Sequence, residues 1–154
     1  MVRDRSSRAG GLGWARGGDA LCFVDAVART LCRAPYLANG NYLQQVSVFA
    51  RTPEKLGRPD GLALDIEDNL WVCQFNGGCL LQYDRNGALL QTLAVPVPRP
   101  TSCCFGGPDM RTLFITTAKF GMSADEHADY PAAGNIYSIR LQVPGRPRHR
   151  FKEL

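Results

Sequence analysis

The segment 57–73, "GRPDGLALDIEDNLWVC", contains two short apolar strands joined by a polar, acidic turn. Short apolar runs bounded by glycine, proline and acidic residues are typical of β-strands. Asp60 stands at the start of the first strand, between Pro59 and Gly61. A carboxylate there must either face solvent or have a partner, because an unpaired buried charge is costly. The role of Asp60 therefore depends on what this strand packs against.

This pattern occurs three times in the chain. Segments that begin at Arg8, Arg58 and Arg99 read "RAGGLGWARGGDALCFVD", "RPDGLALDIEDNLWVCQ" and "RPTSCCFGGPDMRTLFIT". Each has a short alternating strand, a polar turn and a second strand, and a third strand follows: "TLCRAPY", "CLLQYDRNG" or "NIYSIRL". The first two units also show a fourth strand, and Asn86–Gly87 predicts a hairpin turn before one of these.

Four short strands in a unit of about 40–50 residues are typical of a β-propeller blade. We therefore predict an all-β fold with about three blades, at residues 8–50, 58–97 and 99–141. Residues 1–7 are expected to be a disordered segment, and residues 144–154 a solvated basic tail. One short helix is predicted in "SADEHADYP", because Ser123 and Glu126 match a capping box and Pro131 ends it.

Strand alternation predicts which residues pack between blades. Three sets of equivalent positions follow from the repeat. They are Leu12, Leu62 and Cys103; Trp14, Leu64 and Phe105; and, between them, the small residues Gly13, Ala63 and Cys104.

Composition limits the class of protein. The 154 residues carry a net charge of +4, with 45% hydrophobic and 21% charged residues, which is ordinary for a globular domain. No apolar run is long enough for a membrane span, and the start "MVRDRSSRAGG" lacks the apolar core of a secretory signal. We expect a cytoplasmic protein that binds no nucleic acid. Its six cysteines are then reduced, and we interpret them as buried structural thiols, Cys103 and Cys104 included.

Asp60 is the candidate functional residue. In the repeat it is equivalent to Gly10 and Thr101, at the ends of the inner strands that open onto the central channel. A carboxylate there could bind a divalent cation or act as a general base. The alternative is that Asp60 only makes an Asx-type turn before Gly61. The acidic residues Asp65, Glu67 and Asp68 are interpreted as a solvated hairpin turn, and His127 as either an exposed loop residue or a residue at the channel mouth.

Three segments together resemble the regucalcin family, also called the senescence marker protein/gluconolactonase family. They are "RPDGLALDIEDNLWVCQFNGG", "TSCCFGGPDMRTLFITTA" and "AAGNIYSI", and the resemblance covers residues 8–142. It implies a six-bladed propeller that hydrolyses sugar lactones with one divalent cation, most often Ca²⁺, with Zn²⁺, Mn²⁺ or Mg²⁺ as alternatives. The aspartate of the P-D-G motif, Asp60 here, is implied as both metal ligand and acid/base.

The resemblance is incomplete. An asparagine ligand of the family aligns with Gly10, and the other metal and substrate ligands lie in a half of the family that has no counterpart here. Whether the chain is an enzyme is therefore uncertain: it resembles the C-terminal half of a lactone hydrolase, impaired by the missing ligands. The alternative is a truncated, non-catalytic module that binds calcium or a partner.

Three blades cannot close a ring. Both end blades are then expected to present an apolar face, and we predict that Trp14, Phe23, Phe105 and Ile115 contribute to these faces. Such faces favour self-association or pairing with the missing blades, and two copies could complete a six-bladed ring.

Overall fold

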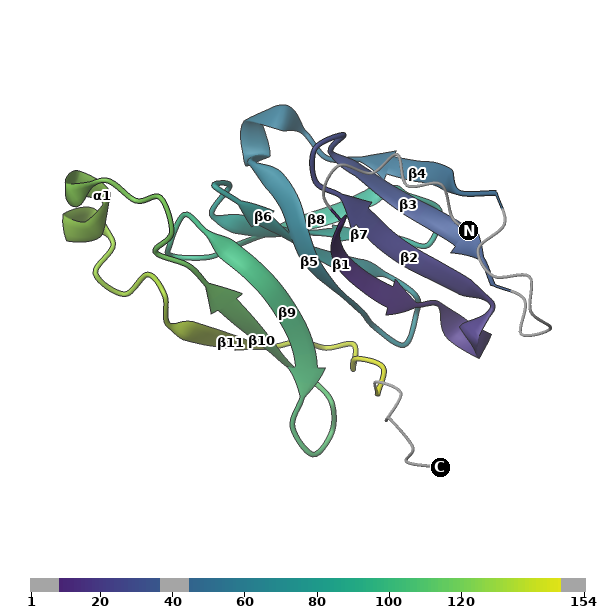
Figure 1. Ribbon diagram of the computed structural model, residues 1–154. Helices are drawn as coiled ribbons and strands as arrows, with labels where there is room; N and C mark the ends of the chain where they lie inside the picture. Colours follow the sequence, from purple (N-terminus) through teal and green to yellow (C-terminus); the bar gives the residue numbers. More distant parts are fainter. Residues whose placement is uncertain (1–8, 37–44, 148–154) are drawn as a thin grey trace, which may run out of the picture.

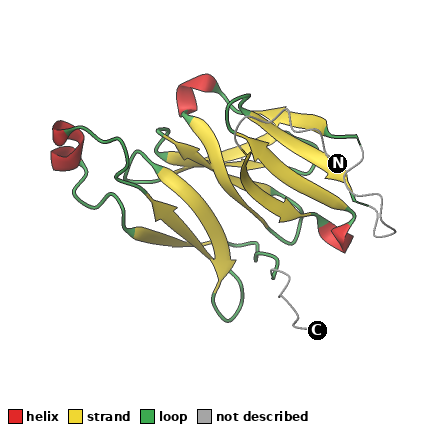
Figure 2. Cartoon of the chain, viewed as in Figure 1, coloured by secondary structure: helices red, strands yellow, loops and turns green. Residues whose placement is uncertain are grey.

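The computed structural model describes residues 9–36 and 45–147, which form three antiparallel sheets and very little helix (Figures 1 and 2). The predicted segment 1–7 and residues 148–154 of the predicted tail lie outside the described residues. In the described part of the chain, no helix has the length and apolar character needed to cross a membrane.

Blade 1 is a four-stranded sheet in which each strand pairs with the next along the chain. Its innermost strand β1 is glycine-rich, and its outermost strand β4 is mostly exposed. The strands are β1 (Ala9–Trp14), β2 (Ala20–Asp25), β3 (Thr30–Pro35) and β4 (Ser47–Arg51), and the 3-10 turn η1 (Arg16–Gly18) joins the first two.

Blade 2 has the same order and is the most deeply buried sheet, because the other two blades cover its faces. The predicted Asn86–Gly87 turn joins its third and fourth strands. The strands are β5 (Arg58–Leu64), β6 (Leu70–Phe75), β7 (Cys79–Tyr83) and β8 (Leu89–Ala94), preceded by the 3-10 turn η2 (Glu54–Leu56).

Blade 3 has three strands among the described residues, in the order β11-β10-β9. The predicted capping box is confirmed: the Ser123 hydroxyl accepts from the Glu126 N–H at 3.1 Å, and the Glu126 carboxylate accepts from the Ser123 N–H at 2.9 Å. The elements are β9 (Pro100–Gly106), β10 (Thr112–Thr117), the helix α1 (Ala124–Asp129) and β11 (Ile136–Arg140).

The three sheets are arranged side by side through their innermost strands: β5 contacts β1 on one side and β9 on the other (Figure 1). Two glycines allow this close approach. A Cβ at Gly11 would lie 2.2 Å from the Leu62 nitrogen, and a Cβ at Gly61 would lie 2.5 Å from the Ser102 Cα. The all-β propeller arrangement predicted from the repeat is thus confirmed.

One apolar core lies between each pair of neighbouring blades, and the register follows the repeat. Leu62 and Leu64 belong to the core between blades 1 and 2, whereas Cys103 and Phe105 belong to the core between blades 2 and 3. Leu12, their equivalent in blade 1, is 60% exposed. We call the face that bears these residues the front face of a blade; it packs against the preceding blade.

Two of the residues predicted on open apolar faces lie elsewhere. Ile115 is 3% exposed, and both Ile115 and Phe105 pack toward blade 2. The opposite side of blade 3, which we call its back face, instead carries Cys104, Phe114 and Ile136. The prediction was wrong because strand alternation groups residues onto one face but does not state which neighbour that face meets.

Two further predictions from local sequence were wrong. Cys104 is exposed rather than buried, because blade 3 has no neighbour on its back face among the described residues. Asp65 is fully buried rather than solvated. Residues 144–147, the described part of the basic tail, lie against the turn of Asp65: the Ile66 N–H donates to the Pro144 carbonyl at 3.0 Å, and Gly145 forms a β-bridge with Asp65.

Candidate functional site

The three inner strands share an irregularity at the equivalent positions 10, 60 and 101. The pairing register of β1 shifts between Ala9 and Leu12, that of β5 between Pro59 and Leu62, and that of β9 at the residue between Pro100 and Ser102. Bulges of this kind redirect side chains and occur often beside active sites. They set Asp60 apart from the regular part of its strand, at one end of the inner strands.

Asp60 is half-buried at this bulge. Gly10 lies beside it: a Cβ at Gly10 would be 2.9 Å from the Asp60 carbonyl oxygen and 3.2 Å from Val24 Cγ1. An asparagine like that of the regucalcin family therefore does not fit at position 10 unless the strands shift. Asp60 is also close enough to Cys73 to act on its thiol. A hydrogen bond with Cys103 and burial hold the pKa of Cys73 well above its usual range, and the Asp60 charge acts in the same direction.

Thr101, the equivalent residue in blade 3, already has partners. Its hydroxyl lies 2.8 Å from the Thr116 hydroxyl and donates to the Thr116 carbonyl at 3.2 Å. The Thr116 hydroxyl also accepts from the Ser102 N–H at 3.1 Å. These bonds stabilise the bulge and hold the Thr101 hydroxyl against its own sheet.

Arg99, at the start of blade 3, was not predicted from the sequence as a residue with a specific role. It directly precedes β9 and is 6% exposed. Its guanidinium donates to Asn76 Oδ1 at 2.6 Å and to the Gly121 carbonyl at 3.0 Å, and forms an ion pair of 3.3 Å with Glu126. Arg99 thus ties the α1 segment of blade 3 to the β6–β7 turn of blade 2. The sequence did contain a signal that could have identified Arg99, because each of the three repeats begins with an arginine.

His127 lies on α1 and is exposed. The described part of the chain gives it no side-chain hydrogen bond and no ion pair, and none with Asp60. Its backbone N–H donates to the Ser123 carbonyl as part of the helix. The position of His127 relative to the channel mouth stays a prediction.

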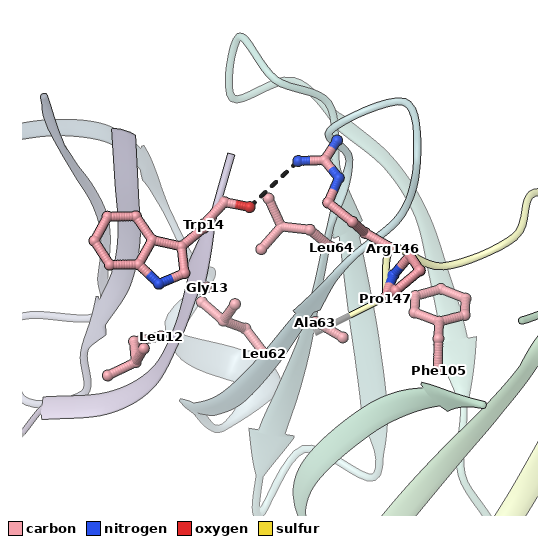
Figure 3. Close-up of a pocket in the computed structure, with 9 residues that line it drawn as sticks. All are labelled: Leu12, Gly13, Trp14, Leu62, Ala63, Leu64, Phe105, Arg146 and Pro147. Carbon is pink, nitrogen blue, oxygen red and sulfur yellow. Dashed lines mark hydrogen bonds between the residues drawn. The ribbon is translucent and has the colours of Figure 1, made fainter. Parts of the chain in front are cut away.

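A cavity of about 200 Å³ is lined by the later residues of β1, β5 and β9 (Figure 3), whereas Asp60 stands near the start of β5. Its lining is apolar apart from Arg146, which donates to the Trp14 carbonyl at 3.3 Å and pairs with Asp68 at 2.7 Å. None of the lining residues within the described ranges carries a carboxylate, imidazole or thiol. The lining residues are Leu12, Gly13, Trp14, Leu62, Ala63, Leu64, Phe105, Arg146 and Pro147.

The described residues alone do not fit a complete divalent-cation site. Within residues 9–36 and 45–147, no three histidine, cysteine or acidic side chains gather where they could hold a metal. Calcium takes six to eight oxygen ligands, and Mg²⁺ requires a near-octahedral set. Asp60 supplies one carboxylate, Gly10 supplies no side chain, and the Thr101 hydroxyl is bonded to Thr116.

Comparison with known proteins identifies the family. Residues 1–119 match the family model described as the SMP-30/Gluconolactonase/LRE-like region. The chain is 35% identical to regucalcin of Danio rerio over 151 residues, which cover 96% of this chain and 51% of the relative. It is 32% identical to pentonolactonase XacC of Haloferax volcanii over 146 residues, which cover 91% of this chain and 50% of that protein.

A solved structure shows the same relation. The crystal structure of a calcium-binding protein, regucalcin, from Agrobacterium tumefaciens str. C58 superposes with a TM-score of 0.85 at 26% identity. The superposition covers 93% of this chain and 50% of that chain. The chain thus spans about half the length of the relatives that it matches, and its three sheets correspond to part of a six-bladed-propeller-type fold. The chain belongs to the SMP-30/Gluconolactonase/LRE-like region family.

Proposed function

We propose that this chain is one half of a sugar-lactone hydrolase, in which Asp60 is the acid/base and a ligand to a divalent cation. The observation that carries the proposal is the position of Asp60 at a bulge shared by all three inner strands, in a chain of the gluconolactonase-like family. A pentonolactonase among the relatives supports a lactone as the class of substrate.

Hydrolysis of a lactone requires water to attack the ring carbonyl and a proton to reach the leaving ring oxygen. The Asp60 carboxylate would accept a proton from the attacking water and return it to that oxygen, as general acid–base groups do. Removal of such a group typically lowers the rate about 10²–10⁴-fold.

A divalent cation, when bound, would polarise the carbonyl. Ca²⁺ is the first candidate, supported by the calcium-binding regucalcin from A. tumefaciens, with Zn²⁺, Mn²⁺ and Mg²⁺ as alternatives. Since the described residues offer one carboxylate, the remaining ligands must come from outside them. The isolated chain is therefore proposed to be an impaired enzyme.

The test is gluconolactone hydrolysis above the spontaneous rate, with and without each added cation. We expect a slow, cation-dependent rate that Asp60→Asn lowers by at least 10²-fold. Asp125→Asn is the matched control, since it removes an exposed carboxylate on α1. An equal cation-stimulated rate in Asp60→Asn would overturn the assignment.

The second candidate is a non-catalytic module that binds calcium or a partner. Two observations favour it: Gly10 offers no side chain, and no three histidine, cysteine or acidic side chains gather in the part of the chain that the structure describes. Calorimetry distinguishes the two. Calcium binding that Asp60→Asn removes, in a chain with no lactonase activity, would support the module over the hydrolase.

We propose the cytoplasm as the compartment. All six cysteines are free thiols, and five of them are buried. Disulfides are rare in the reducing cytosol, so free thiols support that location.

A further inference from the structure

The front face of blade 1 carries a row of apolar side chains that is partly open to solvent. Leu12 pairs with Phe23, which is followed across the sheet by Cys32 and Val48, so these residues share one face. Leu12 is 60% and Val48 50% exposed. Trp14 lies on the same face, two residues after Leu12, and is half-buried. Phe23 is half-buried and Cys32 is 5% exposed, so Leu12 and Val48, at the two ends of the row, are its exposed members. Exposed apolar side chains that cluster on one face mark an interaction site.

The two other blades show what such a front face binds. In blade 2 the equivalent residues Leu62 and Leu64 pack against Cys22 and Val24, which lie on the back face of blade 1. In blade 3, Cys103 and Phe105 pack in the same way against the back face of blade 2. In both junctions inside the chain, the occupant of a front face is the back face of another blade of the same repeat.

The chain has one back face that no blade covers among the described residues, that of blade 3. Cys104 is exposed, Phe114 is 38% exposed and Ile136 is 69% exposed. Cys104 is equivalent to Gly13 and Ala63, and it pairs with Phe114 as Ala63 pairs with Trp71. The back face of blade 3 is therefore equivalent to the back faces of blades 1 and 2, and each of those two covers the front face of the next blade.

We propose that the front face of blade 1 binds the back face of blade 3 from a second copy of this chain, and that two copies close into one ring of six blades. The inference concerns assembly and does not depend on the proposed function. The repeat specifies the contacts at each new junction. Trp71 and Phe105 meet edge to face, with ring centroids 6.4 Å apart and an interplanar angle of 80°. Their equivalents are Phe114 of one copy and Trp14 of the second copy.

The curvature of the chain allows this closure. Its three sheets superpose with a TM-score of 0.85 on half of a chain twice as long, so the rotation from blade to blade matches half of a ring. A two-fold axis along the channel then forms both junctions at once, which closes the assembly instead of extending it.

The new junction differs from the internal ones at several inner-strand positions: Cys104 replaces the smaller Gly13 and Ala63, Trp14 replaces Leu64 and Phe105, and Ser102 replaces a glycine. Ser102 stands where Gly11 and Gly61 allow neighbouring strands within van der Waals distance. We therefore expect the inner strands to lie further apart there, and Cys104 to contact Leu12 and Trp14 of the second copy, as a Cβ at the equivalent Gly13 would meet Leu62 and Leu64.

A cross-link tests the register. Leu12→Cys should form an intermolecular disulfide with Cys104 and give a species of about 34 kDa, twice the 16.9 kDa of one chain. Copper(II)-phenanthroline with dissolved oxygen accepts the two electrons, and each thiol releases one proton. The cross-link should disappear in Leu12→Cys combined with Cys104→Ser. Val27→Cys, at an apolar residue 55% exposed and outside the strands, should form none with Cys104.

Light scattering tests the assembly without a covalent bond. The wild-type chain should have the mass of two copies. Phe114→Glu should give a monomer with unchanged circular dichroism, whereas Phe120→Glu, at a residue 82% exposed outside the sheet, should remain a dimer. A folded wild-type monomer would overturn the proposal. So would assemblies of three or more copies, or a dimer that survives Phe114→Glu and does not cross-link.

Discussion

The indole N–H of Trp71 donates a hydrogen bond of 3.1 Å to Oδ2 of Asp65, and both side chains are almost fully buried in blade 2. Oδ2 also accepts from the side-chain amides of Asn69 at 3.0 Å and Gln82 at 3.4 Å. Oδ1 accepts from the backbone N–H groups of Glu67 and Asn69 at 2.9 and 3.0 Å. A single carboxylate therefore holds the β5–β6 turn against β6 and β7.

The first prediction concerns the stability of this network. Asp65→Ala leaves several buried donors without an acceptor, and each such loss costs about 1–3 kcal/mol. We expect the free energy of unfolding in urea to fall by roughly 3 kcal/mol or more. Glu67→Ala, which removes an exposed carboxylate from the same turn, is the control and should change it by less than about 1 kcal/mol. Similar effects of the two substitutions would show that the Asp65 bonds are not stabilising.

The second prediction concerns the approach of blades 1 and 2. Gly11→Ala places a Cβ 2.2 Å from the backbone nitrogen of Leu62, so the inner strands must separate. Strain of this kind typically costs about 1–3 kcal/mol, and we expect a matching loss in urea denaturation. At Gly106 the nearest atom to an added Cβ is in the half-exposed ring of Phe114, at 3.1 Å. Gly106→Ala should therefore be tolerated. A neutral Gly11→Ala would contradict the close packing of β1 and β5.

The third prediction concerns Arg99. Lysine keeps the positive charge but cannot bind Asn76, Gly121 and Glu126 together, because it lacks the planar donor fork. Hydrogen bonds to charged groups contribute about 1.5–3 kcal/mol, so opening of the α1 segment should become easier by roughly 10–100-fold in Arg99→Lys. Hydrogen exchange of the 121–130 amides measures this.

Arg58→Lys is the control for Arg99→Lys. Arg58 holds the equivalent place before the inner strand of blade 2 but is exposed. Its substitution should leave the exchange of the α1 amides unchanged. Equal protection of those amides in wild type and Arg99→Lys would show that Arg99 does not anchor the segment.

The fourth prediction concerns pH. The Arg140 guanidinium lies 2.7 Å from Asp109 and lowers the pKa of this carboxyl from its ordinary 3.8 to about 2. Because the folded pKa lies below the unfolded one, the pair stabilises blade 3 above about pH 3.8, and that contribution is lost as the pH falls toward 2. Carboxyl NMR should give an Asp109 midpoint near 2 in the wild type.

The matched variants for this titration are Arg140→Gln and Arg111→Gln. The first should return the Asp109 midpoint toward 3.8, since the hydrogen bond from Arg140 is the main cause of the lowered pKa. The second removes a neighbouring positive charge whose guanidinium binds the Gln142 carbonyl, and should leave the midpoint low. A low Asp109 midpoint in Arg140→Gln would refute the pairing.

The repeat predicted the blades because its signals are local. Alternation along each strand, the turn at Asn86–Gly87 and the capping box of Ser123 and Glu126 depend on neighbours in the chain, and the structure contains all three. The same alternation correctly placed Leu62 with Leu64 and Cys103 with Phe105 on core-facing sides. The role of Asp60 in metal binding and catalysis stays a prediction.

The sequence by itself determined that this is a propeller-type chain of three repeated sheets, since strand period and turn chemistry are properties of adjacent residues. Tertiary structure alone decided that Asp65 is buried, because the segment that bonds to its turn, at Pro144 and Gly145, lies about 80 residues away in the chain. It also decided that Phe114, and not Ile115, faces outward from blade 3, because the direction in which the sheets follow one another around the channel determines which face meets a neighbour.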